Sequence, residues 1–268
     1  MRRPKKISLT QVTSWSMLGI GAVALLFSIV YVSSILAFIG LGLVFWGALL
    51  LYIKNPEYIR EDLLETSVYP PLETINQIIR ELAYKGNAVY LPPKYFETPG
   101  NTKIYISKQE NVDLPTPEQI QKHENQVLIR DSQFIPQGIL LTPPGADLTK
   151  LFERKLEMEF TKADLEYLQQ RMPKLFIEDL EIAQNFEMET ANNKVQVKLA
   201  NTAYTNLFKD IMKPSNDKHI LGYPIASAIA CALAKATGKP IVIENQRTSN
   251  DNKDIEIEYR ILEEEKTS

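Results

Sequence analysis

Few side chains in this sequence have the type and spacing that common catalytic sites require. One cysteine, Cys231, and two histidines, His123 and His219, occur among 268 residues. A cysteine nucleophile needs exposure, a lowered pKa and a nearby base, whereas Cys231 lies in an alanine-rich segment that we expect to be a buried helix. The histidines lie in polar stretches without the Cys, His or Asp spacing of a metal site. We therefore predict neither a metal site nor catalysis by Cys231.

Carboxylate pairs are more numerous and could serve general acid–base chemistry. They are Glu61 with Asp62, Glu178 and Asp179 with Glu181, and Glu187 with Glu189. Such chemistry needs a carboxylate in an apolar cleft, and these pairs lie on expected amphipathic helices and a hairpin, where charges are typically solvated. No G-x-S-x-G, H-E-x-x-H, C-x-x-C or G-x-G-x-x-G motif occurs. We identify no catalytic residue, and the sequence leaves open an unusual enzyme that uses scattered carboxylates.

The segment Ala236–Pro240 has a superficial similarity to a phosphate-binding loop. The first glycine of such a loop would fall at Leu233, and Pro240 replaces the Ser or Thr that should follow Lys239. The helix also precedes Gly238 here, so it would present carbonyl groups, which have the wrong polarity for phosphate. We therefore expect no nucleotide at this segment and predict no cofactor.

The element that would position any site is a long apolar stretch, Trp15–Ile53, which contains no charged side chain. As one helix it would be about 58 Å long, almost twice the roughly 30 Å hydrocarbon core of a bilayer. A division at Tyr31–Ser34 gives two spans, Trp15–Val32 and Ile35–Ile53. We predict a transmembrane helical hairpin in the lipid bilayer over residues 15–53. A signal peptide is the alternative, but the apolar region is too long and lacks a small-residue cleavage site.

Cations before the hairpin predict its orientation. Short flanks rich in Lys and Arg stay on the cytoplasmic side, and four such residues are Arg2, Arg3, Lys5 and Lys6. Two crossings then place both termini in the cytoplasm of a cell-membrane protein, and a single cysteine suits that reducing compartment. The residues after the hairpin carry a net charge of −7, which argues against a nucleic-acid partner.

Small and aromatic residues within the hairpin predict its packing. Five glycines could let the two helices approach closely: Gly19, Gly21, Gly40, Gly42 and Gly47. Trp15, Trp46 and Tyr52 are candidate interfacial anchors, although Trp46 lies inside the second span.

Beyond the hairpin the patterns predict an α+β soluble region. We divide the chain into a basic N-terminus (1–14), two transmembrane helices (15–53), a helical linker with a small β-containing region (54–137) and a C-terminal α+β domain (138–268). Whether 54–268 forms one domain or two is left open. The expected helices are Glu57–Ser67 and Leu72–Lys85 separated by Pro70-Pro71, Asp147–Leu156, Ala163–Asn185 capped by Thr161 and kinked or divided at Pro173, Thr202–Met212, and Tyr223–Thr237. The expected strands are Ala88–Leu91, Lys103–Ser107, Gln126–Arg130, Gly138–Leu141, Phe186–Thr190, Lys194–Leu199, Pro240–Glu244 and Asp254–Leu262. Gln109–Glu124 is expected to be an exposed linker or lid, and Pro214–His219 a polar loop.

The C-terminal third has a distinctive order of expected elements. A hairpin at Asn192-Asn193 and the helix Thr202–Met212 are followed by Gly222-Tyr223-Pro224, the small-residue helix Ile225–Ala236 and the strands Lys239–Glu244 and Asp254–Arg260. This order resembles the end of small-molecule-binding domains of the vinyl-reductase type. It implies a ligand-binding domain. Because Gln246–Ile255 contains no cysteine where those domains commonly carry them, their metal or redox chemistry does not carry over, and no ligand-binding residue is transferred.

Four short motifs carry a second resemblance. They are Pro143-Pro144-Gly145, Leu151-Phe152-Glu153, Ser227-Ala228-Ile229-Ala230 and Gly238-Lys239-Pro240. In these motifs the chain resembles uncharacterised archaeal two-span membrane proteins with a cytosolic domain. Together these features favour a membrane-anchored cytosolic binding module: a ligand sensor, adaptor or scaffold with a small-molecule or protein partner. The alternatives are a membrane-tethered enzyme and an accessory subunit of a larger membrane complex. A closed apolar pocket near Ile225–Ala236 would favour small-molecule binding.

Overall fold

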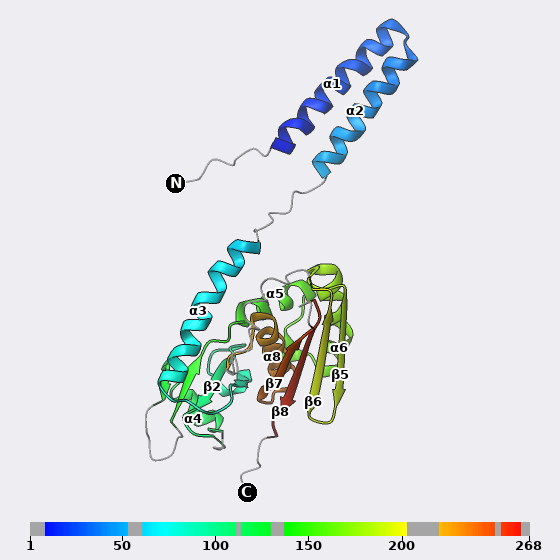
Figure 1. Cartoon of the computed structure of the whole chain (residues 1–268). Helices are drawn as coiled ribbons and strands as arrows, with labels where there is room; N and C mark the ends of the chain where they lie inside the picture. Colours follow the sequence, from blue (N-terminus) through cyan, green and yellow to red (C-terminus); the bar gives the residue numbers. More distant parts are fainter. Residues whose placement is uncertain are drawn as a thin grey trace. The chain divides into compact units, whose positions relative to one another are not determined.

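The computed structural model describes residues 9–52, 61–110, 114–129, 137–202, 220–249 and 253–263. Side chains of the first and third helices are described from Thr13 and from Pro70 onward. The chain divides into two compact units, Met1–Ile59 and Arg60–Ser268, each of which can be followed in Figure 1. The first is a pair of apolar helices, and the second combines helices with an antiparallel sheet.

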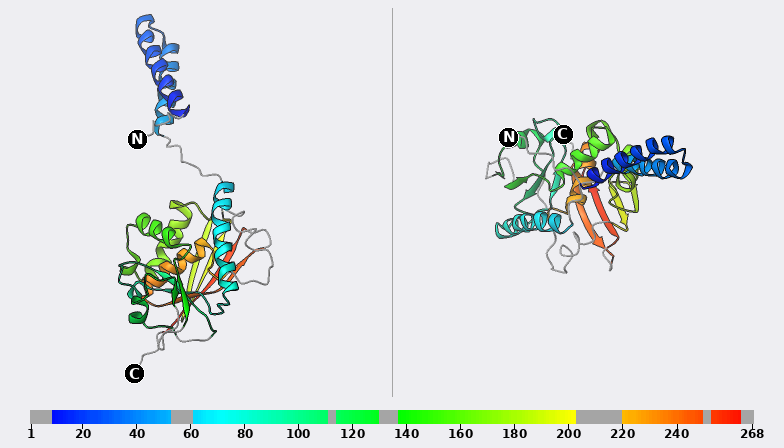
Figure 2. Two further views of the ribbon diagram at one scale, coloured as in Figure 1. Left: turned by 90° about the vertical axis from the view of Figure 1, so that its left-hand side faces the viewer. Right: turned by 90° about the horizontal axis from the view of Figure 1, so that it is seen from above.

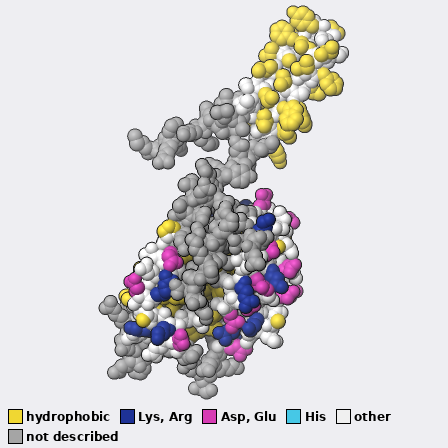
Figure 3. All heavy atoms as spheres, viewed as in Figure 1, with side chains coloured by type: hydrophobic (Ala, Val, Ile, Leu, Met, Phe, Trp, Pro, Cys, Tyr) yellow, Lys and Arg dark blue, Asp and Glu magenta, His cyan; other side chains and the backbone are white. Residues whose placement is uncertain are grey.

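The first unit is the expected helical hairpin. Helix α1 spans Leu9–Tyr31 and α2 spans Ser34–Tyr52, with the turn where the sequence predicts it. The 19 residues of α2 extend about 28 Å, close to the roughly 30 Å of a hydrocarbon core. Both helices are long and apolar enough to cross a membrane. Figure 3 shows apolar side chains over their outer surface.

Small residues seven positions apart form the contact between α1 and α2. Those buried at this contact are Ser14, Gly21 and Ser28 in α1, and Gly40 and Gly47 in α2. A Cβ atom on Gly40 would lie 2.9 Å from Leu25 Cγ and 3.0 Å from Gly21 O, so a larger residue would push the helices apart. A seven-residue repeat is typical of helices that wind around each other with a left-handed supercoil.

The other two glycines of the hairpin do not take part in this contact. A Cβ on Gly19 or Gly42 would meet nothing within 4 Å, so the expected role holds for three of the five glycines. The Cβ position of Gly47 lies 3.2 Å from Ser14 O. The adjacent residues Trp46 and Trp15 are therefore at the same, open end of the hairpin, and both are exposed.

The second unit begins with α3, Glu61–Glu81, which is one helix where the sequence predicted a break at Pro70-Pro71. The predicted break was wrong: both prolines lie inside the helix. The fixed φ of proline, about −65°, is a helical value, although each proline also removes one N–H donor. The helix also ends before the expected stop at Gly86, and Ala83 has a φ of +57°.

Two neighbouring faces of α3 differ in their surroundings. Leu72 and Ile79 are buried in the main core. Ile75, Ile78 and Leu82 are 38%, 48% and 46% exposed, and Leu82, just past the helix, still donates its N–H to Ile78 O at 3.0 Å. We call Ile75, Ile78 and Leu82 the α3 row.

In the part of the chain that the structure describes, eight antiparallel strands form one sheet in the order β3-β4-β2-β1-β7-β8-β6-β5. The strands are β1 (Val89–Leu91), β2 (Lys103–Ser107), β3 (Leu128–Ile129), β4 (Gly138–Leu141), β5 (Asn185–Ala191), β6 (Lys194–Ala200), β7 (Ile241–Thr248) and β8 (Ile255–Ile261). Strand β2 pairs with β4, and β1 pairs with β7. The boundary at 137/138 that the sequence suggested therefore runs through the sheet, and residues on both sides of it share one core.

Helix α8, Pro224–Thr237, packs against the sheet together with α5 (Ala146–Leu156) and α6 (Leu165–Lys174) (Figures 1 and 2). Alternate strand residues such as Val197, Ile257 and Tyr259 are buried in this core. Every residue of α8 from Ala226 to Lys235 is buried. The sequence predicted this buried, small-residue helix correctly, and Gly238 ends it with a left-handed φ of +63°.

A second, smaller core forms at the β1–β4 end of the sheet. Strand residues Val89 and Leu140 pack there with the short 3₁₀ helix η1 (Pro93–Tyr95) and with Ile120 of α4 (Pro117–Gln121). The prediction of an exposed linker over Gln109–Glu124 was wrong in its second half, because Thr116 begins α4 with a capping box and Ile120 is fully buried.

The helices after α5 begin and end at other residues than predicted. Thr161 lies in a 3₁₀ turn, η2 (Phe160–Lys162), and the N-cap of α6 is Asp164, whose side chain accepts from Tyr167 N at 2.8 Å. Pro173 lies in the last turn of α6, which continues as a π-helical turn, η3 (Leu175–Asp179), instead of running to Asn185. An aspartate competes well with threonine as a cap.

The β5–β6 hairpin turns at Asn192-Asn193 as predicted, and Asn192 has a φ of +53°. The predicted helix Thr202–Met212 and the loop Pro214–His219 lie outside the described residues, apart from Thr202 itself.

Candidate functional site

Two of the motifs quoted for the archaeal resemblance contact each other. Pro143-Pro144-Gly145 leads into α5, and Ser227-Ala228-Ile229-Ala230 lies in α8. A Cβ on Gly145 would lie 2.1 Å from Ala228 N, so only glycine allows this approach. The N–H of Gly145 donates to Ser227 Oγ at 3.0 Å. These motifs therefore fix how α5 packs on α8.

Glu153 and Lys235 form a buried ion pair between the same two helices. Lys235 Nζ lies 3.0 Å from Glu153 Oε1 and 2.9 Å from Oε2. The side chains of Lys235 and Glu153 are 5% and 16% exposed, respectively. Glu153 Oε1 also accepts from Phe160 N at 3.0 Å, so this carboxylate joins α5, α8 and η2. Sequence reasoning missed the pair because 82 residues separate its partners and neither lies in a recognisable motif.

Two buried tyrosine hydroxyl groups from the sheet lie against the start of α8, and the single thiol, Cys231, lies within that helix. Tyr90 Oη donates to Leu221 O at 2.6 Å, and Tyr259 Oη donates to Ala226 O at 3.1 Å. Burial raises the pKa of both tyrosines, and it raises the pKa of Cys231 to about 12. Cys231 is buried in α8, as expected from its alanine-rich surroundings, and its raised pKa favours the protonated thiol.

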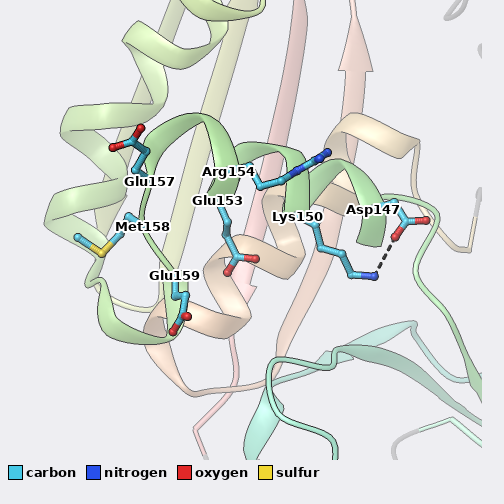
Figure 4. Close-up of a pocket in the computed structure, with 7 residues that line it drawn as sticks. All are labelled: Asp147, Lys150, Glu153, Arg154, Glu157, Met158 and Glu159. Carbon is cyan, nitrogen blue, oxygen red and sulfur yellow. Dashed lines mark hydrogen bonds and ion pairs between the residues drawn. The ribbon is translucent and has the colours of Figure 1, made fainter.

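An open pocket of about 710 Å³ lies beside α5, next to the buried ion pair. Its lining residues, drawn in Figure 4, are Asp147, Lys150, Glu153, Arg154, Glu157, Met158 and Glu159. Figure 4 shows Lys150 extended towards Asp147, 2.9 Å away. Glu159 pairs with Lys162 at 2.7 Å. The pocket thus presents charges of both signs.

Two carboxylates of this pocket are held in their ionised form. The hydrogen bond from Lys150 lowers the pKa of Asp147, and the hydrogen bond from Lys162 lowers that of Glu159. A general acid at neutral pH would need the opposite, a raised pKa. The arrangement is suited to holding a polar ligand through ion pairs and hydrogen bonds.

A second pocket, of about 640 Å³, lies at the end of the β5–β6 hairpin and is lined by Ile177, Glu181, Ala183, Gln184, Asn201, Thr202 and Lys253. Glu181 and Asn201 both have positive φ, of +51° and +50°. Neither pocket is the closed apolar pocket near Ile225–Ala236 that would favour small-molecule binding. Residues Ala226 to Lys235 of that helix are all buried.

Carboxylates predicted to be solvated lie on the open face of the sheet. Four charged residues of alternating sign are paired across neighbouring strands: Glu187 of β5, Lys198 of β6, Glu256 of β8 and Arg247 of β7. Such a row of alternating charges stabilises the strand pairing and keeps this face in water. Glu187 and Glu189 are exposed there, so this pair is solvated, as the sequence predicted.

The remaining sequence candidates are not brought together. Glu178 and Asp179 lie on η3, and Glu178 is 4.0 Å from Lys174. His123 is half-buried, with Nδ1 3.0 Å from Gln126 Oε1. His219 and the side chains of Glu61 and Asp62 are outside the described part of the chain. Among the described residues, no group of three or more His, Cys, Asp and Glu could hold a metal ion.

Comparison with known proteins gives a family without an assigned role. No curated protein and no solved structure matches the chain. A family model described as a domain of unknown function, DUF7982, matches residues 3–261. That match covers the hairpin and the whole sheet, so the chain belongs to the DUF7982 family.

Proposed function

We propose that this protein is a membrane-anchored binding module, in which the α1–α2 hairpin holds the second unit at the cytoplasmic face of the cell membrane. The observation that carries the proposal is the packing of the hairpin. Its small residues face inward at seven-residue spacing, while bulky apolar side chains face outward and none is charged. A lipid bilayer is the solvent that matches such a surface.

Trp15 and Trp46 allow a direct test of the anchor, because they are the two tryptophans of the chain and both lie in the hairpin. Their position at its open end suits the interfacial belt of a membrane. We expect lipids brominated near the headgroup to quench tryptophan emission in reconstituted vesicles more strongly than lipids brominated near the bilayer centre. Emission that neither lipid quenches would contradict insertion.

Orientation is tested separately. The cations before α1 favour a cytoplasmic N-terminus, and two crossings return the chain to the same side. Protease added outside intact cells should leave residues 54–268 uncut, and should cut them once the membrane is permeabilised. Cleavage in intact cells would overturn the orientation.

Binding itself is proposed at the pocket beside α5. Its paired charges of both signs favour a small polar molecule that carries charged groups. The charged groups of such a ligand could form ion pairs with the lining side chains in place of the pairs that these side chains make with each other. Ionised, paired carboxylates support binding over the alternative of a tethered enzyme. The described exposed apolar side chains of the second unit are few, which gives the accessory-subunit alternative less support.

The ligand can be sought by purification in mild detergent followed by mass spectrometry of co-purifying small molecules. We expect Arg154→Ala, in the pocket, to lose the bound molecule. Lys174→Ala removes a cation of α6 that is not among the pocket's lining residues and should retain it. Equal retention by both variants would argue against this pocket.

A further inference from the structure

The α3 row gives the helix more apolar surface than its own unit uses. Ile75, Ile78 and Leu82 are separated by three and four residues, so they lie on one line along the helix, as core positions do in a two-helix seam. Each remains more than a third exposed. Of the large apolar side chains exposed in the described part of the second unit, these three form the larger group; the others are Val127 and Leu128 beside the sheet edge.

Charges beside the row are already paired within α3. Arg80 Nη2 lies 2.8 Å from Glu73 Oε1, and Gln77 Nε2 donates to Glu81 Oε1 at 2.8 Å. Residues 70–82 carry a net charge of −1. Anionic lipid and nucleic acid attract basic surfaces, so neither suits this helix. A partner whose surface has an apolar row and almost no net charge is compatible with α3. A second copy of the chain presents such a surface, namely its own α3 row.

Contact area limits the strength of such an association. Three partly exposed side chains offer on the order of 200–300 Å² per copy, against about 800 Å² per partner in a typical stable complex. The row alone would not hold a dimer in dilute solution. Copies anchored in one bilayer meet at a much higher effective concentration, and this step rests on the membrane anchoring proposed above.

We infer that the α3 row is the contact between two copies of this chain in the membrane. A closed pair of identical chains is related by a twofold axis. Ile78 is the central residue of the row, so an axis through the middle of the contact brings it close to its own counterpart whether the two helices run parallel or antiparallel.

Cysteine cross-linking of the full-length chain tests this contact. Ile78→Cys and the control Gln77→Cys, on the adjacent polar side of α3, are reconstituted in phosphatidylcholine vesicles and oxidised. Native Cys231 is fully buried, so the wild type measures the background. We expect severalfold more disulfide-linked dimer from Ile78→Cys than from Gln77→Cys. Adding Ile75→Gln, which changes an exposed side chain, should lower the yield of Ile78→Cys to the level of the control.

Two results would overturn the inference. One is equal cross-linking by Ile78→Cys and Gln77→Cys. The other is quenching, by brominated lipid, of a fluorophore attached to the introduced thiol of the Ile78→Cys variant, which would identify the bilayer as the occupant of the row. Flotation of the same vesicles separates the two proposals: protein that fails to float contradicts the anchor, whereas protein that floats without specific cross-linking contradicts only the self-association.

Discussion

At the scale of single residues, Glu153 has the most consequential contacts. Its carboxylate accepts from Lys235 of α8 and from the backbone of Phe160, and it lines the pocket beside α5. Removing one partner of a buried ion pair leaves an uncompensated charge, and this typically costs about 3–5 kcal/mol. The pair is therefore expected to matter more to stability than the exposed pairs around it.

We predict that Lys235→Met lowers the free energy of unfolding by about 3–5 kcal/mol. Adding Glu153→Gln should recover part of the loss, because glutamine removes the stranded charge and still offers an oxygen to Phe160 N. Urea denaturation of the full-length chain in mild detergent, followed by circular dichroism, measures both variants. A double variant less stable than Lys235→Met alone would contradict this account of the pair.

Glu124 should make part of the stability dependent on pH. Its carboxylate is buried and accepts from Thr98 Oγ1 at 2.7 Å and from Glu97 N at 2.6 Å. The hydrogen bond from Thr98 is the main reason that its pKa lies below the usual value of 4.5. A lowered pKa in the folded state means that the stabilisation is complete above the unfolded-state pKa and is lost as the pH falls through the folded-state pKa.

Glu124→Gln should accordingly be less stable than the wild type at neutral pH, with the difference shrinking below about pH 4.5. Denaturation midpoints measured across the acid range test this. The exposed Glu189→Gln serves as a control: Glu189 lies on β5 and is not buried. A constant difference between wild type and Glu124→Gln at every pH would exclude the carboxylate as its source.

At the scale of elements, the hairpin offers a matched pair of glycines on one helix. Gly40 faces α1 closely, whereas a Cβ on Gly42 would meet nothing within 4 Å. We expect Gly40→Leu to destabilise the hairpin by about 1–3 kcal/mol or more through overpacking, and Gly42→Leu to have little effect. Unfolding in a denaturing detergent can be followed by tryptophan emission, which reports on the hairpin alone. Equal effects of both substitutions would mean that the helices do not pack through this seam.

Local signals in the sequence predicted individual turns and helix ends better than the contacts between elements. The Asn192-Asn193 turn, the glycine that ends α8 and the turn between the two apolar helices are each encoded within a few residues, so they were predicted correctly. Asp164 displaced Thr161 as a cap because neighbouring residues compete closely for that role. The Glu153–Lys235 pair and the β1–β7 pairing depend on contacts between distant segments, which periodicity in one sequence does not encode. The pocket beside α5 was missed for a different reason: its lining residues all lie within Asp147–Glu159, but a helical pattern does not show where the surface beside a helix is hollowed.

At the scale of the whole molecule, the sheet order determines when the fold can be completed during synthesis. Val89 of β1 pairs with Val242 of β7, so the middle of the sheet joins one of its earliest strands to one of its last. Until β7 and β8 leave the ribosome, the nascent chain can build only two separate sheets, β3-β4-β2-β1 and β6-β5. The apolar hairpin near the N-terminus emerges long before that point. We therefore expect the chain to reach the membrane with its second unit still in two halves, and a truncation before Ile241 to leave both halves with open, aggregation-prone edges.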